Sequence, residues 1–233
     1  MKIEIWSDYA CPFCYIGERR LSKAIDELGA RDEIAIEFKS FELDPYASRE
    51  VESKTVDRFA VKYGLTVDDA ARQIEGISEM GRREGIDFRY ATTLYTNTFD
   101  ALRITKLAQS KDKTEIIEKL FDAYFTKNLV LGDHSVLKKI AAEVGLDASE
   151  VDDVLNSDAF AEEVRRDEKE AAEYGIHAVP YFVINQKYSL SGAQPLETIK
   201  DALKKLLERE REDAAIKKFD GMTCGANGCR FDG

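Results

Sequence analysis

Two cysteines near the start of the chain, Cys11 and Cys14, are the residues whose type and spacing most directly indicate chemistry. Together with the residues between them they read Cys-Pro-Phe-Cys. An alternating apolar stretch, residues 2–6, precedes them, and residues 18–28 follow with apolar positions at helical spacing. The pair is therefore predicted to lie where a strand gives way to the start of a helix.

A cysteine in that position is expected to be reactive. The first turn of a helix leaves backbone N–H groups unpaired, and these groups and the helix dipole stabilise a negative charge. Cys11 should therefore lose its proton more readily than a free cysteine, and its thiolate is a nucleophile. Cys14 follows within disulfide reach, and Pro12 presets the backbone of the first turn. We interpret Cys11 as the attacking thiol and Cys14 as the resolving thiol.

Two other interpretations of the pair stay open. Cysteine packs well as a small apolar side chain, so both residues could be ordinary core residues. Alternatively, Cys224 and Cys229 near the end of the chain could complete a four-thiolate zinc site. Structural zinc usually takes its ligands from two short knuckles, and a Cys-x4-Cys in a terminal tail is a poor second knuckle. The expected metal content is therefore none.

Length and composition limit the classes of function. A chain of 233 residues with 44% hydrophobic residues can bury a sizeable core. The net charge of −11, from 34 basic and 45 acidic residues, argues against nucleic acid or an anionic membrane as partner. We find no apolar run of membrane-spanning length and no export signal at the start, so we expect a cytoplasmic protein. In a reducing compartment a close cysteine pair is more often catalytic or redox-sensing than structural.

The remaining pattern predicts an α/β protein with a long helical segment inside it. Residues 33–41 alternate like a second strand, so the chain opens β-α-β with parallel strands and a right-handed crossover. Strands return at 179–184 and 187–191, and a helix at 196–207 follows. The helices predicted between these two parts cover residues 55–63, 66–84, 98–109, 115–126, 135–144, 149–155 and 159–174.

This pattern divides the chain into three parts. Residues 1–54 and 175–210 are predicted to form one discontinuous domain that contains the sheet. Residues 55–174 are predicted to form a helical insertion domain, and residues 211–233 a terminal tail that carries the Cys-x4-Cys.

Four sequence blocks together resemble the FrnE-type branch of the DsbA family. A Cys-x-x-Cys at the start of the first helix, together with a Val-Pro-aromatic sequence at the start of a late strand, already resembles the thioredoxin fold. The blocks are Asp-Tyr-Ala-Cys-Pro-Phe-Cys-Tyr-Ile-Gly at 8–17, Asn-Thr-Phe-Asp-Ala-Leu-Arg at 97–103, Gly-Ile-His-Ala-Val-Pro-Tyr-Phe-Val-Ile at 175–184 and Ser-Gly-Ala-Gln-Pro at 191–195. They occur in matching order over nearly the whole chain.

The resemblance implies a thioredoxin-like fold with a large all-helical insertion. It also implies thiol–disulfide oxidoreductase or isomerase activity on protein or low-molecular-weight disulfides. Such an enzyme needs no bound cofactor besides its redox-active disulfide, and glutathione is a candidate electron donor. Whether the protein is a monomer or a dimer stays open.

The resemblance also assigns roles to individual residues. Cys11 becomes the nucleophile and Cys14 the resolving cysteine. The residues expected to contact substrate are Pro12, Phe13, Val179 and Pro180. An X-Pro bond is trans by default, and only the resemblance favours a cis Val179–Pro180 bond.

The chain departs from the family pattern at two positions. Leu102 stands where the second block is expected to have histidine, which weakens any role for that position. Phe13 stands where DsbA has a histidine whose imidazolium would stabilise the thiolate, so we expect a less oxidising couple than that of DsbA. Asn97 and Arg103 of the second block are candidates for shaping the pocket between the insertion and the sheet.

The terminal cysteines have two interpretations. FrnE-like proteins tend to end in a Cys-x4-Cys, which Cys224 and Cys229 match, and such a dithiol could relay electrons to Cys11 and Cys14. The alternative is a loose tail in which two cysteines happen to be close.

Other polar residues are weaker candidates. A partly buried Glu4 or Asp8 could accept the proton of Cys14 during resolution. His177 lies close to the proline block in sequence, but with only His134 as a companion it makes no credible metal pair.

Two alternative functions remain. Kappa-class glutathione transferases and 2-hydroxychromene-2-carboxylate isomerases share the implied architecture and bind glutathione, but they usually carry serine at the position of Cys11. A non-catalytic redox- or metal-sensing module would use all four thiolates.

Overall fold

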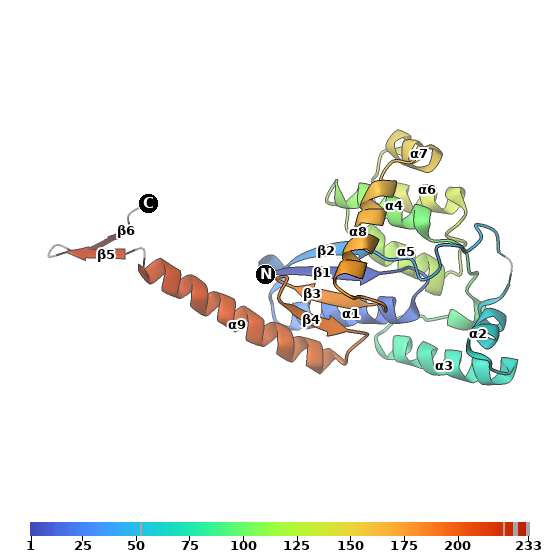
Figure 1. Cartoon of the computed structure of the whole chain (residues 1–233), viewed down its shortest axis with the longest axis horizontal. Coiled ribbons are helices and arrows are strands. Elements are labelled where there is room, and N and C mark those ends of the chain that lie inside the picture. The colour runs from blue at the N-terminus through green and yellow to red at the C-terminus, as the bar shows by residue number, and fades with distance from the viewer. Residues whose placement is uncertain (52, 221, 226–227, 232–233) are drawn as a thin grey trace.

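The computed structural model describes residues 1–51, 53–220, 222–225 and 228–231, with side chains as far as residue 213. A four-stranded sheet in the order β2-β1-β3-β4 forms its centre (Figure 1). The strands are β1 (Lys2–Ser7), β2 (Ala35–Ser40), β3 (Tyr181–Ile184) and β4 (Tyr188–Ser191). β1 is parallel to β2 and antiparallel to β3, and β3 is antiparallel to β4. The first and last parts of the chain thus share one sheet.

The alternation of side chains along β1 sends apolar residues to both faces of the sheet. Ile3 and Ile5 belong to one buried cluster, which α1 (Pro12–Glu27) and α9 (Leu196–Asp220) complete. Trp6, on the opposite face, belongs to the larger cluster formed with the helical segment. Because both faces are buried, β1 lies at the centre of the molecule, and the residues that follow it are held firmly.

Among the described residues, seven helices occupy the segment between β2 and β3. They are α2 (Thr55–Tyr63), α3 (Val67–Arg83), α4 (Phe99–Gln109), α5 (Ile116–Phe125), α6 (His134–Glu143), α7 (Ala148–Asn156) and α8 (Ala161–Glu173). Two short 3-10 turns, η1 (Arg31–Glu33) and η2 (Tyr90–Thr92), lie in the connections. The predicted pattern of a sheet carrying an inserted helical segment is confirmed, whereas the predicted domain boundaries stay a prediction.

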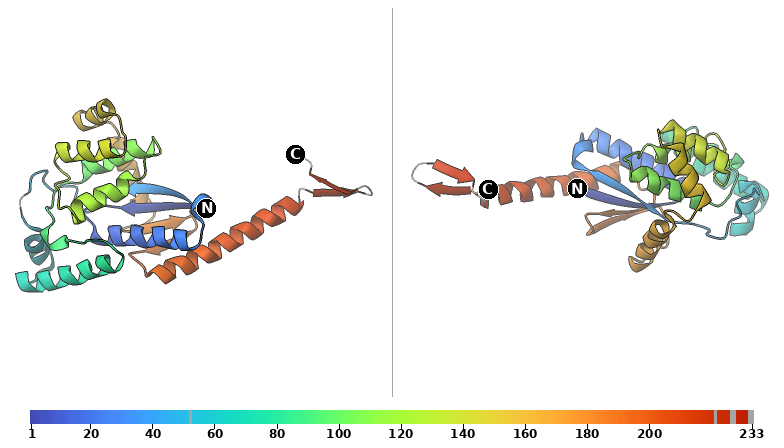
Figure 2. Two further views of the ribbon diagram at one scale, coloured as in Figure 1. Left: turned by 180° about the vertical axis from the view of Figure 1, so that it is seen from behind. Right: turned by 90° about the horizontal axis from the view of Figure 1, so that it is seen from above.

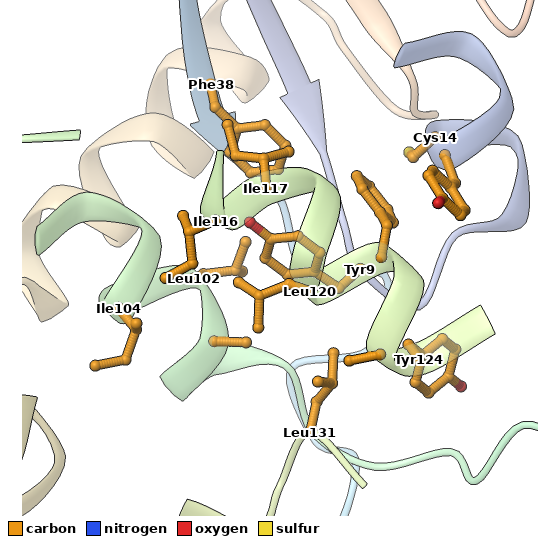
Figure 3. Close-up of a cluster of buried hydrophobic side chains, with 14 of the residues drawn as sticks. Tyr9, Cys14, Phe38, Leu102, Ile104, Ile116, Ile117, Leu120, Tyr124 and Leu131 are labelled. Atoms are coloured by element: carbon orange, nitrogen blue, oxygen red, sulfur yellow. The ribbon is translucent and has the colours of Figure 1, made fainter. Parts of the chain in front are cut away.

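Aromatic side chains join the insertion to α1. The Tyr15 ring stacks on Phe121 with centroids 5.0 Å apart and an interplanar angle of 4°. Tyr9 contacts the same ring at 4.9 Å, and Phe88 stacks on Phe125 at 4.7 Å. Figure 3 shows part of this core, with Cys14 at its edge. The start of α1 is therefore packed into the core of the insertion as well as onto the sheet.

Helix α9 is longer than the sequence pattern predicted. Its first turns pack Ile199, Leu203 and Leu207 onto the sheet, where the predicted helix ended. The charged residues that follow continue the helix, and there Arg211 forms a bidentate pair with Glu33. In Figures 1 and 2 the later turns of α9 extend away from the sheet.

Helix α1 begins at Pro12, which confirms the predicted start of the helix at the cysteine pair. A proline at the first helical position fits there, since its fixed φ suits the helix and it lacks an N–H that would be unpaired anyway. The structure thus places the first helical turn immediately after Cys11.

A glycine in α1 allows the helix to approach the loop before β3 closely. A Cβ atom added to Gly17 would lie 3.0 Å from Cγ of Pro180 and 3.3 Å from Cζ of Phe182. We expect Gly17→Val to lower the free energy of unfolding by about 1–3 kcal/mol, because the added methyl groups overpack this contact. Urea denaturation measures the effect.

Gly76 in α3 is the matched control. It lies exposed in a helix, and an added Cβ would have nothing within 4 Å. Gly76→Val should leave stability unchanged or raise it by a few tenths of a kcal/mol, since valine has the higher helix propensity. Equal effects of the two substitutions would contradict the close-approach argument.

Candidate active site

Cys11 caps the start of α1, and Cys14 lies in its first turn. The backbone of Cys11 is extended, with φ −91° and ψ 113°, and its N–H donates to the carbonyl of Asp8 at 3.0 Å. Both cysteines are reduced in the structure and both are buried, with exposed fractions of 3% for Cys11 and 0% for Cys14. The predicted position of the pair at the helix start is confirmed.

The loop before β3 lies directly against the first sulfur. The Val179–Pro180 peptide bond is cis. The Cys11 thiol donates to the carbonyl oxygen of Val179, with Sγ and O 3.5 Å apart. The structure therefore brings together the two cysteines and the proline loop, which lie at opposite ends of the sequence.

The environment of Cys14 opposes its ionisation. Burial raises the pKa of the Cys14 thiol well above its usual value, and the neighbouring Cys11 sulfur raises it further. The Ser7 hydroxyl and the Asp8 backbone act in the opposite direction as hydrogen-bond donors. Cys14 therefore stays a thiol at neutral pH, as a resolving cysteine should before the mixed disulfide forms.

Asp8 fixes the turn that precedes the cysteines. Its buried carboxylate accepts hydrogen bonds from the N–H of Leu43 at 2.7 Å, the N–H of Ala10 at 3.1 Å and the hydroxyl of Thr98 at 2.8 Å. Burial raises the pKa of Asp8, and these three hydrogen bonds lower it in part. Asp8 thus ties three chain segments together beside the site.

The other candidate base, Glu4, has different partners. Its buried carboxylate contacts Lys2 at 2.9 Å and Lys39 at 3.9 Å on β1 and β2. Among the described residues, neither the Glu4 carboxylate nor the Asp8 carboxylate has a hydrogen bond to Cys14. The proposal that one of them accepts the Cys14 proton stays a prediction.

A further carboxyl group near the site was missed by the sequence analysis. Glu42 is buried, and this burial raises its pKa to about 6 although Arg165 contacts it at 2.5 Å. The amide of Asn97 reaches Glu42 Oε1 at 3.5 Å, while Asn97 Oδ1 accepts the N–H of Phe99 at the start of α4. A single glutamate that follows a strand gives no signal in the sequence that its carboxyl group will be buried and its pKa raised.

Arg103 has a structural role within the helical insertion. It donates to the carbonyl oxygens of Ala159, at 2.9 Å, and Ser157, at 2.5 Å, and it pairs with Asp100. Asp100 in turn contacts Nε2 of His134 at 2.8 Å. The prediction that Arg103 shapes the pocket is not supported, because its guanidinium holds the link between α7 and α8.

A cavity of about 240 Å³ opens beside Cys11. Pro12, Phe13, His177, Ala178 and Val179 contribute to one side of it. The side chains from the insertion that line the rest are Thr55, Arg58, Phe59, Lys62, Tyr63, Ile77, Tyr90, Tyr95 and Tyr124. Sequence analysis missed these residues, because nothing in the local sequence shows which faces of separate helices meet.

The terminal cysteines lie elsewhere in the molecule. Strands β5 (Met222–Gly225) and β6 (Gly228–Phe231) form a two-stranded sheet in which Cys224 and Cys229 are register partners. Figure 1 shows these strands at the distal end of α9, beyond the start of β1, whereas Cys11 follows the end of β1. The structure brings Cys224 and Cys229 together in register but does not bring them to Cys11.

Within the part of the chain that the structure describes, no three His, Cys, Asp or Glu residues are grouped to hold a metal ion. Over the same residues, no helix combines the length and the apolar character needed to cross a bilayer.

The model of the DSBA-like thioredoxin domain family matches residues 2–204. The chain belongs to this family. The family and the thioredoxin-like fold with its helical insertion are confirmed, and the chain is thus a thiol–disulfide oxidoreductase or isomerase in general terms. The FrnE-type branch stays a prediction.

Individual relatives extend this comparison. A probable DsbA oxidoreductase from Streptomyces coelicolor is 33% identical, covers 100% of both chains and has a TM-score of 0.83. The protein YwbO from Bacillus subtilis is 27% identical over 190 residues, which are 78% of this chain and 86% of YwbO. The cytosolic disulfide reductase DsbM from Pseudomonas aeruginosa, solved with GSH, shares the fold at 14% identity and a TM-score of 0.63, covering 89% and 100% of the two chains.

Glu18, one turn after Cys14 in α1, gives the protein a testable pH dependence. Its Oε2 atom is buried and has no hydrogen-bond partner among the described residues. Burial raises the pKa of Glu18 to about 7, and the nearby Glu118 adds to the effect. Because the folded-state pKa is raised, the neutral carboxyl favours folding fully below about pH 4.5, and this advantage is lost as pH rises to about 7.

We expect Glu18→Gln to be more stable relative to wild type at pH 8 than at pH 4.5. The difference should reach up to about 3 kcal/mol, since each pKa unit corresponds to about 1.4 kcal/mol. Urea denaturation at the two pH values measures it. Glu115→Gln, at an exposed position on the neighbouring segment, makes the same change of charge and is the control. A pH-independent difference between Glu18→Gln and wild type would show that Glu18 does not titrate in this range.

Proposed function

We propose that Cys11 and Cys14 form a redox pair that exchanges disulfides with protein or low-molecular-weight substrates. One observation carries the proposal: the two reduced cysteines occupy the cap and first turn of α1, with the Cys11 sulfur 3.5 Å from the Val179 carbonyl of the proline loop. A helix start favours the thiolate, and the partner thiol lies one turn away.

The reaction would proceed in two exchange steps. The Cys11 thiolate attacks one sulfur of the substrate disulfide, the substrate S–S bond breaks, and the first half leaves as a thiolate. Cys14 then loses its proton and attacks the Cys11 sulfur, so that the second half leaves as a thiolate and the Cys11–Cys14 disulfide forms. Two electrons pass from the dithiol to the substrate, and the reverse sequence oxidises a substrate dithiol.

The surroundings of Cys14 support this order of events. While Cys11 carries a negative charge, that charge helps to keep Cys14 protonated. Once Cys11 is part of a mixed disulfide the charge is gone, whereas the donors from Ser7 and Asp8 remain to stabilise a Cys14 thiolate. The second thiol is thus activated only after the first has reacted.

The substrate-side roles follow from the same geometry. Val179 and Pro180 lie against the attacking sulfur, so their backbone is available to a bound substrate once the Cys11 thiol no longer donates to it. Pro12 and Phe13 line the adjacent cavity. With phenylalanine in place of an imidazole, the couple should suit a reducing compartment such as the cytoplasm, with glutathione as electron donor and no bound cofactor.

Redox titration tests the pair. In buffers of graded glutathione ratio, with the terminal cysteines replaced by serine, we expect Cys11 and Cys14 to form one internal disulfide. Cys11→Ser should abolish all exchange, and Cys14→Ser should accumulate the mixed disulfide at Cys11, because no resolving thiol remains. Intact-mass spectrometry detects each species. If Cys11 in the wild-type pair reacts no faster with iodoacetamide at neutral pH than a free cysteine, the mechanism fails.

A finer proposal concerns Cys224 and Cys229, which we propose act as an auxiliary dithiol that exchanges with the first pair. Their cross-strand register supports a disulfide between them. We expect Cys224→Ser/Cys229→Ser to slow turnover with an external reductant several-fold while leaving the Cys11–Cys14 potential unchanged. Unchanged turnover would show that the terminal pair is not part of the cycle, and a shifted potential would show that the substitutions disturb the first site.

A further inference from the structure

Access to Cys11 is restricted although the cysteine lies at a helix start. Its exposed fraction is 3%, whereas Phe13 two residues later is 37% exposed. Exchange requires a substrate sulfur to reach the Cys11 sulfur in line with the bond that breaks, so a reactive cysteine must be accessible. The cavity of about 240 Å³ is the space that adjoins this sulfur. A disulfide held in a bulky folded protein cannot enter it, whereas a small disulfide can.

The size of the cavity agrees with a small ligand. Ligand pockets usually measure about 300–1,000 Å³. At about 240 Å³ the cavity has room for one half of a low-molecular-weight disulfide next to Cys11, with the other half at the mouth. Its wall is largely aromatic, with Phe59, Tyr63, Tyr90 and Tyr95.

The charges in the cavity wall indicate the sign of the ligand. The described lining residues include Arg58 and Lys62 but no aspartate or glutamate. Arg58 lies 3.6 Å from the centroid of the Tyr95 ring and forms an ion pair with Asp44, outside the lining. Lys62 is exposed and has no ion pair with any described residue. In a chain with a net charge of −11, this wall is a local positive site that favours an anion.

A buried hydroxyl group supplies a second, independent observation. Tyr124 is 1% exposed and lines the cavity, yet its hydroxyl has no hydrogen-bond partner among the described residues. Hydroxyls of Thr55 and Thr93 lie close enough to influence its pKa, but neither reaches it with hydrogen-bond geometry. Figure 3 shows Tyr124 at the edge of the cluster with its oxygen turned away from the other labelled side chains. An unpaired buried hydroxyl costs about 1–3 kcal/mol, which a polar ligand group would offset.

We propose that the cavity beside Cys11 is the binding site for a low-molecular-weight disulfide that carries a carboxylate. The carboxylate lies against Lys62 and Arg58, a polar group of the ligand bonds to Tyr124, and the ligand sulfur faces Cys11. This inference rests on the proposed function and names its substrate class.

The proposed exchange takes place in two steps. The Cys11 thiolate breaks the ligand S–S bond, joins the half in the cavity and releases the other half as a thiolate. Cys14 then displaces the bound half, so that one ligand disulfide becomes two thiols and the protein dithiol becomes a disulfide. A low-molecular-weight monothiol, acting twice, returns the protein to its dithiol form.

Three small disulfides of different charge test the proposal: dithiodipropionate, which is anionic, bis(2-hydroxyethyl) disulfide, which is neutral, and cystamine, which is cationic. The measurement is the second-order rate of mixed-disulfide formation at Cys11 in the Cys14→Ser/Cys224→Ser/Cys229→Ser variant, followed by mass spectrometry. We expect the anionic probe to react about fivefold faster than the neutral one after correction for their rates with free cysteine, as one partly exposed charge contact predicts. The cationic probe should react most slowly. If that variant does not fold, the release of thiol by wild type gives the same comparison.

Substitutions in the wall separate binding from structure. Lys62→Gln should lower the ratio of the anionic rate to the neutral rate to near one, whereas Lys204→Gln at an exposed position on α9, with the same change of charge, should leave that ratio unchanged. Tyr124→Phe should slow the anionic probe and also raise the thermal stability of the unliganded protein, because it deletes an unpaired hydroxyl. A purely structural hydroxyl would give slower reaction together with lower stability.

The outcomes are distinct. If Lys62→Gln does not change the ratio of the anionic rate to the neutral rate, the inference is overturned, while the proposed function stays intact. Reduction of insulin disulfides as fast as that of dithiodipropionate would overturn it in favour of protein substrates. If no probe reacts at Cys11 faster than with free cysteine, the proposed function itself fails.

Discussion

The structure depends on the enclosure of the start of α1 between the sheet and the helical insertion. Tyr15 in the first turns of α1 stacks on Phe121 of α5, and Gly17 lies against Pro180 of the loop before β3. This packing holds the two cysteines at a helix start, where a thiolate is favoured, and also removes them from water. Enclosure keeps Cys14 protonated and leaves Cys11 in contact with one small cavity. The same contacts therefore control both reactivity and access.

The electrostatics of the site oppose strong activation. Asp8 is buried in the turn before the cysteines, and Glu42 lies buried close by with Arg165 as its cationic partner. An ionised carboxylate disfavours a second negative charge nearby, and the Cys-Pro-Phe-Cys segment contributes no imidazolium to compensate. The helix start is the feature of the site that favours a negative charge there.

Local signals made the central part of the fold and of the site predictable. The period-two stretch before Cys11, the proline at the helix start and the Val-Pro-aromatic entry into β3 each depend on neighbouring residues alone. Their meeting in space follows from the sheet, in which β1 pairs with both β2 and β3. The cis state of the Val179–Pro180 bond was expected only from the family resemblance, because the local sequence favours trans.

Features that depend on distant contacts were not predictable in the same way. Sequence analysis ended the last helix at residue 207, yet residues 208–213 continue α9, where Arg211 pairs with Glu33 near the start of β2. The tyrosines of the cavity wall come from separate segments of the insertion, and each could equally have been a core residue. Glu18 and Glu42 acquire raised pKa values only through burial, which composition does not show.

The placement of the terminal cysteines limits how the two dithiols can communicate. Cys224 and Cys229 lie on strands at the far end of α9 (Figure 1), while Cys11, which lines the cavity, follows the opposite end of β1. A strand pair is too bulky to enter a space of about 240 Å³ without displacement of the insertion. In the proposed exchange a small disulfide enters the cavity, takes two electrons from Cys11 and Cys14 and leaves as two thiols, and these thiols could then reduce a disulfide of the terminal pair in the same or another copy. A small anionic carrier would thus reconcile a buried nucleophile with an auxiliary dithiol that the fold holds away from it.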